Sequence, residues 1–303
     1  MKVAACLVLL AACQPDLDQR TFLVDEPRVL AVIAQPAEAA PGATVVLTAI
    51  IAVPGAATPP TLSWSACAAP KPPTEDNPVA AACVGELAED ARGTSAAMHV
   101  PTDACQVFGP EPRLDGGRPR DADLTGGYYQ PFRVRQVDGP LADDDQGRDA
   151  FALPRLACNL AGAPTDVALD FRDRYVRNAN PPAPIVTRTD GVPLDTPIVA
   201  GATLALRVTR DETAAEPYVA LDPATVTLVT RREGLRATWY ADAGTLALDA
   251  AGTSDALDAG AAPTPTLDNT FTAPTTPGLV HLWIVLRDSR GGAAVTTTTL
   301  DVQ

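Results

Sequence analysis

The acidic stretch at 143–149 has the residue types and spacing of an oxygen-ligand metal loop. Its carboxylates Asp143, Asp145 and Asp149 are two and four residues apart, within the range of calcium-binding loops. The stretch departs from the EF-hand pattern, because Gly147 occupies the place of a ligand and no glutamate closes the loop. Two interpretations stay open, a calcium site or an acidic loop exposed to solvent. A loss of thermal stability on chelation would favour calcium.

Other residues suited to catalysis are few or isolated. The two histidines, His99 and His281, each lie in an apolar stretch that is typical of a strand. A strand residue that faces solvent or has a hydrogen-bond partner is therefore favoured over a general base. The sequence contains no Gly-x-Ser-x-Gly elbow, and it has neither a phosphate-binding glycine loop nor a His-Glu-x-x-His helix. A glycosidase-type carboxylate pair stays open, although aromatic residues make up only 5%, which is few for a sugar-stacking cleft.

The N-terminal residues have the pattern of an export signal. Lys2 gives a positive start, and residues 3–12 form an apolar run that is too short to span a bilayer and typical of a secretory signal peptide. The run ends in Leu10-Ala11-Ala12-Cys13, which resembles the lipobox of bacterial lipoproteins. The resemblance implies cleavage before Cys13, a diacylglyceryl group on its thiol, and acylation of the new amino terminus. The alternative is an ordinary signal peptide that is cleaved nearby.

The lipobox also implies a location. Two or three acyl chains, such as palmitate, would anchor the mature chain stably, since one chain alone gives only marginal membrane binding. Gln14 follows the cysteine, whereas in the lipoproteins that this pattern resembles Asp often marks retention in the inner membrane. We therefore expect a lipid-anchored protein of the cell envelope, in the outer membrane, with residues 13–25 as its lipidated tether.

Four cysteines remain once Cys6 in the signal peptide and the lipidated cysteine are set aside. An even number in an exported protein predicts two disulfides. Of the three pairings we favour the one whose first bond closes a short proline-rich loop: Cys67–Cys83 and Cys105–Cys158. The alternative is a four-cysteine metal site, but no two of these cysteines have the two-residue spacing that such sites usually show.

Composition restricts the partners and the fold. The chain has 303 residues, a formal net charge of −14 and 46% hydrophobic residues, which is enough apolar content for folded cores. The acidic balance argues against nucleic acid as a partner, because no basic surplus exists to displace counterions from phosphates. The 30 prolines and 21 glycines favour short strands joined by turns over a bundle of long helices.

A strand pattern occurs in two copies. Residues 41–48 (PGATVVLT) match residues 200–207 (AGATLALR), and each copy is followed by a strand-like segment with a central tryptophan, Trp64 or Trp239. The interval from glycine to tryptophan is longer in the second copy. The best hairpin joins an apolar strand before residue 288 to the threonine-rich strand that follows residue 292.

The stretch 277–292 is similar to the penultimate strand and final hairpin of immunoglobulin-like and PKD-like domains of bacterial surface proteins. The mature chain also resembles a group of uncharacterised bacterial lipoproteins with two such domains. This resemblance implies a mainly β fold with two immunoglobulin-like β-sandwich domains, at 26–162 and 183–303, and no known catalytic residue. The second copy has no cysteine, so the chain departs from the antibody type.

Residues 163–182 are predicted to form a helix and a linker between the domains. Thr165 or Asp166 is suited to cap the helix. Apolar residues recur every four positions and predict a buried stripe: Val167, Phe171 and Tyr175. We expect this helix to pack against the end of the first domain or between the domains.

Three functions follow from these features. The leading hypothesis is a non-enzymatic envelope lipoprotein that acts as a structural or protein-binding module, with the membrane and an envelope protein as partners. The second is a carbohydrate-binding or adhesin-like surface module, in which Tyr128 or Tyr129 contacts a glycan. The third is an enzyme with carboxylates in an unrecognised cleft. No cofactor is expected except the calcium ion considered above.

Overall fold

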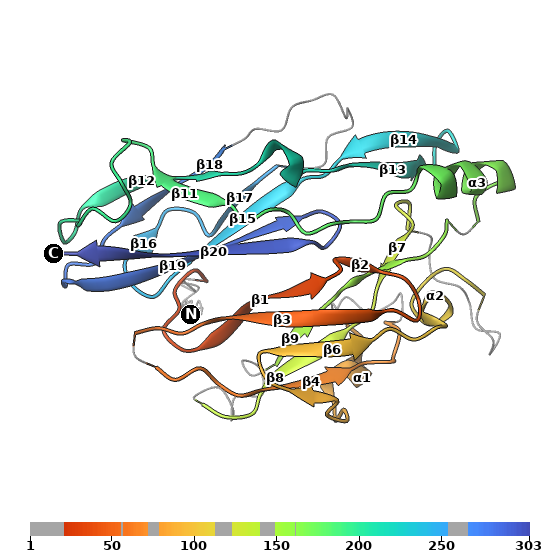
Figure 1. Ribbon diagram of the computed structural model, residues 1–303, viewed down its shortest axis with the longest axis horizontal. Coiled ribbons are helices and arrows are strands. Elements are labelled where there is room, and N and C mark those ends of the chain that lie inside the picture. Colours follow the sequence, from red (N-terminus) through yellow and green to blue (C-terminus); the bar gives the residue numbers. More distant parts are fainter. Residues whose placement is uncertain are drawn as a thin grey trace, which may run out of the picture.

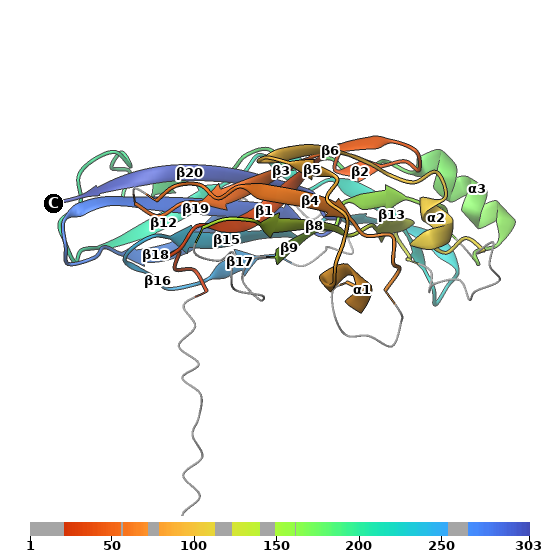
Figure 2. The same cartoon turned by 90° about the horizontal axis from the view of Figure 1, so that it is seen from below.

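The computed structural model describes residues 21–55, 57–71, 79–112, 123–139, 149–160, 162–253 and 266–303. This part of the chain is mainly β and forms two β-sandwiches that lie against one another (Figure 1). Helix α3 lies at one end of the body and the C-terminus at the other, while helix α1 (Ala81–Val84) projects from the first sandwich (Figure 2). In the described residues no helix is long and apolar enough to cross a membrane.

Two sheets form the first sandwich. One has the order β1 (Arg28–Gln35), β3 (Thr44–Ala52), β6 (Ser95–His99). The other has the order β5 (Ala91–Arg92), β4 (Leu62–Ala66), β8 (Phe132–Gln136), β9 (Asp149–Ala152). All neighbouring strands are antiparallel. Their apolar residues alternate along the strands, so that Leu47, Trp64 and Phe132 meet in a shared core.

The second sandwich repeats this plan. One sheet has the order β11 (Ile185–Arg188), β12 (Thr203–Thr209), β18 (Thr266–Thr272), β16 (Thr245–Leu246). The other has the order β17 (Ala250–Gly252), β15 (Leu235–Ala241), β19 (Gly278–Asp288), β20 (Ala293–Val302). Its core includes Leu206, Trp239 and Phe271.

The two copies share one strand order, which confirms the predicted repeat. In each, the first, second and fifth main strands share a sheet, and the third, sixth and last strands share the other, as in immunoglobulin-like sandwiches. Trp64 on β4 and Trp239 on β15 hold equivalent places, and both are fully buried. The longer interval in the second copy is explained by an inserted hairpin, β13 (Pro217–Asp222) with β14 (Thr227–Arg232).

Short elements decorate the first sandwich. A small sheet has the order β2 (Glu38–Ala39), β10 (Arg155–Ala157), β7 (Gly127–Tyr129). Helix α2 (Ala104–Val107) packs near β10, and the second sandwich carries one 3-10 turn, η1 (Glu212–Ala214). The small sheet matters because it brings Glu38, Tyr129 and Arg155 to the side that faces the second sandwich.

Helix α3 (Thr165–Arg174) follows the first sandwich. Its predicted stripe is confirmed, since Phe171 is buried against Leu160 of the first sandwich and Val219 of the inserted hairpin. The predicted cap was wrong. The N-cap residue is Pro164, which makes no side-chain hydrogen bond to the helix. Thr165 is already the first helical residue, and Asp166 lies in the first turn, where its charge suits the helix dipole.

The middle of strand β19 is buried on both faces. Val280, Leu282, Ile284 and Leu286 point into the second core. On the other face, a second apolar cluster joins the sandwiches: Val24, Leu30, Ala31, Ala52, Trp283 and Val285. Burial of both faces removes the need for polar residues at alternate positions, which explains why this segment reads as a nearly continuous apolar run.

The segment just before β1 belongs to the second sandwich. Phe22 is part of the second core, and Leu23 pairs with Ala241 through the hydrogen bonds Val24 N to Ala241 O (2.8 Å) and Ala241 N to Phe22 O (3.0 Å). The tether predicted at 13–25 is therefore too long at its far end. The physical reason is that β17 leaves the end of β15 free to pair, and Phe22 fills the adjoining core.

Candidate functional site

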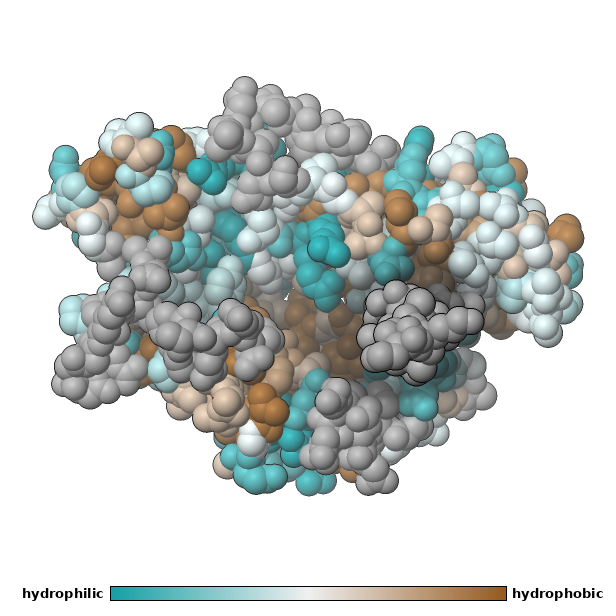
Figure 3. Space-filling view, turned by 180° about the vertical axis from the view of Figure 1, so that it is seen from behind, coloured by the Kyte–Doolittle hydropathy of each residue, from teal (hydrophilic) through white to brown (hydrophobic). Residues whose placement is uncertain are grey.

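A cleft of 390 Å³ lies between the two sandwiches. It is lined by two edge strands, one tyrosine and the β19–β20 hairpin: Val29–Val32, Ala150–Leu153, Tyr129, Arg287, Gly291 and Ala293. Most of this lining is apolar, and Figure 3 shows an apolar surface recessed between the two halves of the molecule. The volume falls at the small end of the range for small-molecule sites, which also favour domain boundaries.

The edge of β1 inside this cleft is closed to an added strand. The pairing of β1 with β3 shifts register between Val29 and Ala31, so Leu30 forms a bulge. Arg287 Nη2 donates a 2.8 Å hydrogen bond to the carbonyl oxygen of Leu30. A bulge and a charged side chain at an exposed edge both oppose strand addition.

Arg287, which lines the cleft, has a second arginine as its neighbour across the sheet. Arg287 on β19 pairs directly with Arg236 on β15, so their side chains share one face of the sheet. Within the described ranges, neither guanidinium forms an ion pair with a carboxylate. Like charges directly opposite each other destabilise a sheet, and here they lie in a chain of net charge −14. The mouth of the cleft is therefore suited to an anion.

A buried polar group of residues adjoins the cleft and is called the junction cluster here: Glu38, Arg155, Tyr175, Asn178, Glu233, Asp288 and Arg290. In its first half, Arg155 Nε lies 3.4 Å from Glu38 Oε2, and both side chains are about fully buried. Tyr175 Oη donates to Glu38 Oε1, and the backbone N–H of Asn178 donates to Glu38 Oε2 at 2.7 Å. Burial, with the charge of Glu38, raises the pKa of the Tyr175 hydroxyl, which keeps it a donor.

The second half of the junction cluster centres on Arg290. Its Nε donates to Glu233 Oε1 at 2.5 Å, its Nη2 to Glu216 Oε2 at 3.1 Å, and its Nη1 to the carbonyl oxygen of Val176 at 3.0 Å. Asp288 Oδ1 accepts the N–H groups of Arg290 and Gly292 at 2.8 Å. The linker after α3 is thus hydrogen-bonded to both sandwiches.

The junction cluster predicts a pH-dependent stability. Burial raises the pKa of Glu233 to about 7, with the charge of Asp288 adding to the rise and Arg290 opposing it. Because this pKa exceeds the ordinary value of 4.5, the folded state binds the Glu233 proton more tightly than the unfolded state does. The contribution of this proton to stability is fully present below about pH 4.5 and is lost as the pH rises through 7. We expect the free energy of unfolding of Glu233→Gln, measured with urea, to rise relative to that of the wild type as the pH increases from 5 to 8.

The control for this measurement is Glu89→Gln, since Glu89 is an exposed partner of Arg92. The Glu89→Gln difference from the wild type should stay flat over the same pH interval. A Glu233→Gln difference that is equally flat would contradict the assignment of the titration to Glu233.

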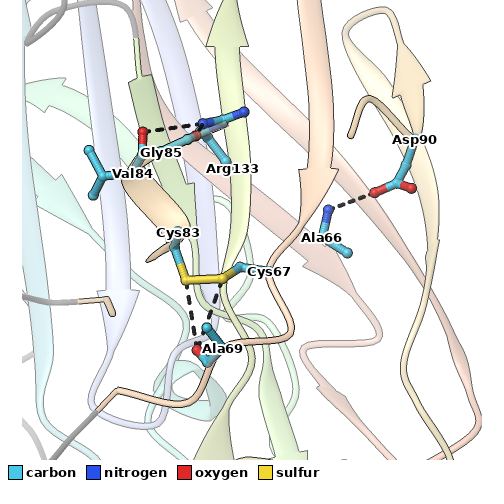
Figure 4. The surroundings of a disulfide bond; sticks show 8 residues. All are labelled: Ala66, Cys67, Ala69, Cys83, Val84, Gly85, Asp90 and Arg133. Atoms are coloured by element: carbon cyan, nitrogen blue, oxygen red, sulfur yellow. Dashed lines mark hydrogen bonds between the residues drawn. A yellow bond between two sulfur atoms is a disulfide. The ribbon is translucent and has the colours of Figure 1, made fainter. Parts of the chain in front are cut away.

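The four predicted disulfide cysteines pair as favoured from the sequence. Cys67 joins Cys83 and Cys105 joins Cys158. Figure 4 shows the first bond with both sulfur atoms near the carbonyl oxygen of Ala69, at 4.0 and 3.7 Å. Nearby, Arg133 donates to the carbonyl oxygen of Gly85 at 2.5 Å, which fixes the C-terminal end of α1.

Loss of the disulfide that closes the longer loop should cost more stability. Cys105 and Cys158 are 53 residues apart, and Cys67 and Cys83 are 16 apart. Loop-closure entropy gives about 4 kcal/mol for the Cys105–Cys158 bond and about 3 kcal/mol for the Cys67–Cys83 bond. We expect Cys105→Ala/Cys158→Ala to lower the melting temperature more than Cys67→Ala/Cys83→Ala in calorimetry. The reverse order would contradict the expectation.

The calcium residues are only partly described. Asp143 and Asp145 lie outside the described residues, as do Cys13 and the rest of the lipobox. Asp149 begins β9 and accepts hydrogen bonds from Arg135 Nε and Nη2, both at 2.7 Å. Among described residues, no group of three or more His, Cys, Asp or Glu is placed to hold a metal ion. The calcium site therefore stays a prediction, and its one described residue has an arginine partner.

The histidines and tyrosines singled out from the sequence lie in different surroundings. His99 is exposed at the end of β6, and His281 Nδ1 lies 2.7 Å from Asp242 Oδ2. Tyr128 is buried, and its hydroxyl accepts the N–H of Asp123, so it has no surface to offer a glycan. Tyr129 is 39% exposed and lines the cleft.

Sequence reasoning missed the junction cluster. Glu38 is the single charge in the run Pro36-Ala37-Glu38-Ala39-Ala40, and a lone charge among small apolar residues is a signal of a paired buried group. Arg290 had no such signal, because its segment reads as an ordinary hairpin turn.

Comparison with known proteins finds similarity among solved structures but not among family models or curated proteins. No protein-family model matches the sequence. No curated protein matches it. Among solved structures, the chain is similar to the fibronectin(III)-like modules of Clostridium thermocellum CbhA, with 9% identity, a TM-score of 0.24, and coverage of 91% of this chain and 94% of that one.

Two further structures show similarity of the same order. Yersinia pseudotuberculosis adhesin InvE has 14% identity and a TM-score of 0.23, over 89% of this chain and 58% of that one. Murine CEACAM1b has 12% identity and a TM-score of 0.23, over 92% of this chain and all of that one. With scores this low, the fold assignment depends on the strand pairings of this chain, and no function is transferred from these proteins.

Proposed function

We propose that the protein is a lipid-anchored module of the cell envelope, attached through Cys13 to the outer membrane, which binds an envelope protein without catalysing a reaction. The supporting sequence feature is Leu10-Ala11-Ala12-Cys13. Two disulfides fit an exported protein.

The observation that carries the binding role is the continuous join between the sandwiches. The apolar cluster around Trp283 and the junction cluster together bury residues of both sandwiches and of the linker. Separate domains on a flexible linker would need neither. A partner would therefore meet one rigid body, which lowers the entropy cost of binding.

The position of Thr21 sets how far this body stands from the bilayer. Thr21 Oγ1 donates to Asp249 Oδ2 at 2.5 Å, and Arg28 Nη2 donates to the Thr21 carbonyl oxygen at 2.7 Å. Seven residues lie between Cys13 and Thr21, and a fully extended chain spans at most about 3.6 Å per residue, so Thr21 would lie within about 30 Å of the anchored sulfur. A partner would therefore be met near the same membrane surface.

Cross-linking in intact envelopes tests this function. The full chain and its Cys13→Ala variant are compared, with purification in detergent and mass spectrometry. We expect one envelope protein to be cross-linked reproducibly to the lipidated form and lost from the variant. Recovery of the lipidated form without any cross-linked protein, in repeated experiments, would contradict a binding role.

A further inference from the structure

We infer that the cleft between the sandwiches binds a small amphiphilic anion, with its apolar body against β1 and β9 and its carboxylate at Arg287. This site goes beyond the proposed function and does not depend on the lipid anchor. Both sandwiches contribute to it, so neither alone would form it.

Apolar residues make up most of the cleft lining. Val29 and Val32 on β1, Phe151 on β9 and Leu153 just after β9 line the cleft. The two strands are edge strands of different sheets of the first sandwich. The two valines also pack against the first core and Phe151 against the cluster around Cys67 and Cys83, yet all three keep part of their surface exposed, and Leu153 is exposed. A ligand that covered them would gain the hydrophobic free energy that the folded chain leaves unused.

Arg287 and its cross-strand neighbour Arg236 supply the positive charge. Arg287 lines the cleft and donates one hydrogen bond, to Leu30. A guanidinium has five N–H donors, so donors remain for a carboxylate. Arg236 is the direct cross-strand neighbour of Arg287 and adds positive charge on the same face of the sheet beside the cleft, whereas the cleft lining contains no carboxylate.

Two observations choose this occupant over others. The bulge at Leu30 and its hydrogen bond to Arg287 occupy the strand edge, which opposes an extended peptide that would pair with β1. The volume of 390 Å³ is at the low end for ligand sites, which excludes a two-chain membrane lipid. A soluble carboxylate with one short apolar chain fits both limits.

Calorimetric titration with three probes tests the site. The protein is the chain from residue 14 onward, which contains every described residue, and the probes are octanoate, 1-octanol and acetate. We expect octanoate to bind about 10-fold or more tightly than 1-octanol, because only octanoate offers the charged hydrogen-bond acceptor. Acetate should not bind, because it lacks the apolar body.

Variants locate the binding. Arg287→Gln should weaken octanoate to the level of 1-octanol and leave 1-octanol within about twofold, while Arg207→Gln, in an exposed pair with Asp268 on the opposite sheet, should change neither. Should Arg287→Gln fail to fold, Leu153→Glu and Leu153→Gln provide the second test. Leu153→Glu should weaken octanoate much more than Leu153→Gln, since only the glutamate competes for Arg287.

Three results would overturn the inference. They are no octanoate binding at millimolar concentration, equal affinity for octanoate and 1-octanol, and octanoate binding that Arg287→Gln and Leu153→Glu leave unchanged. Binding of an extended apolar peptide with displacement of octanoate would assign the cleft to strand addition instead.

Discussion

Replacement of the buried Arg290 by methionine is expected to lower the free energy of unfolding by about 3–5 kcal/mol. Arg290 is the cation between Glu233 and Glu216, and its loss leaves the Glu233 carboxylate buried without a counter-charge. The loss should be larger at pH 8 than at pH 5, because protonation of Glu233 removes the unpaired charge at low pH. Urea unfolding at the two pH values measures both effects.

The control for Arg290→Met is Arg207→Met. Arg207 also pairs with a carboxylate, Asp268, but both side chains are exposed, and exposed ion pairs contribute little. The double variant Arg290→Met/Glu233→Gln should recover part of the lost stability, because it removes the unpaired carboxylate. A loss for Arg290→Met as small as for Arg207→Met would contradict the central place of Arg290 in the junction cluster.

Replacement of Trp283 by alanine is expected to cost about 3–5 kcal/mol and to uncouple the two sandwiches. Trp283 belongs to the apolar cluster that joins them, with Leu30 and Ala31 from the first sandwich. Its variant keeps Trp64 and Trp239, one in each sandwich. Unfolding followed by fluorescence and by circular dichroism should therefore change from one transition to two.

The matched control is Trp239→Ala. Trp239 is fully buried inside the second sandwich and lies away from the join, so its loss should be of similar size without the same uncoupling. A single transition in Trp283→Ala, or two transitions of equal separation in both variants, would show that the apolar cluster does not couple the sandwiches.

Local patterns predicted the parts of the fold that depend on neighbouring residues. The repeat, the tryptophan on the third main strand and the β19–β20 hairpin follow from strand periodicity and turn residues. The pairing of Cys67 with Cys83 followed from their short separation. These features could be predicted because a strand records in its sequence which face is buried.

Periodicity does not record what covers a buried face, and this limit explains what was missed. The apolar run around Trp283 indicated a buried strand but not that the first sandwich covers its outer face. Phe22 lay in a segment read as a tether, although it fills the second core. In both cases the covering partner is far away in the sequence.

The candidate site was beyond prediction for the same reason. Its lining comes from four separate segments, near residues 30, 129, 151 and 290, and no spacing rule connects them. The sequence offered as candidates only the carboxylates of the 143–149 loop and the two tyrosines. The structure instead directs attention to Arg287, whose neighbour Arg236 is adjacent only across the sheet.

The join between the sandwiches and the short tether have one functional consequence together. With Cys13 acylated as proposed, Thr21 would lie within about 30 Å of the anchored sulfur, and a protein partner would be met near the membrane surface. This consequence depends on the proposed acylation of Cys13.

The mass of the amino-terminal peptide from the native protein tests that proposal most directly. We predict a peptide that begins at Cys13 and carries a diacylglyceryl group on sulfur and an acyl chain on its amino group. A peptide with an unmodified Cys13, or one that still contains residues 1–12, would contradict the account.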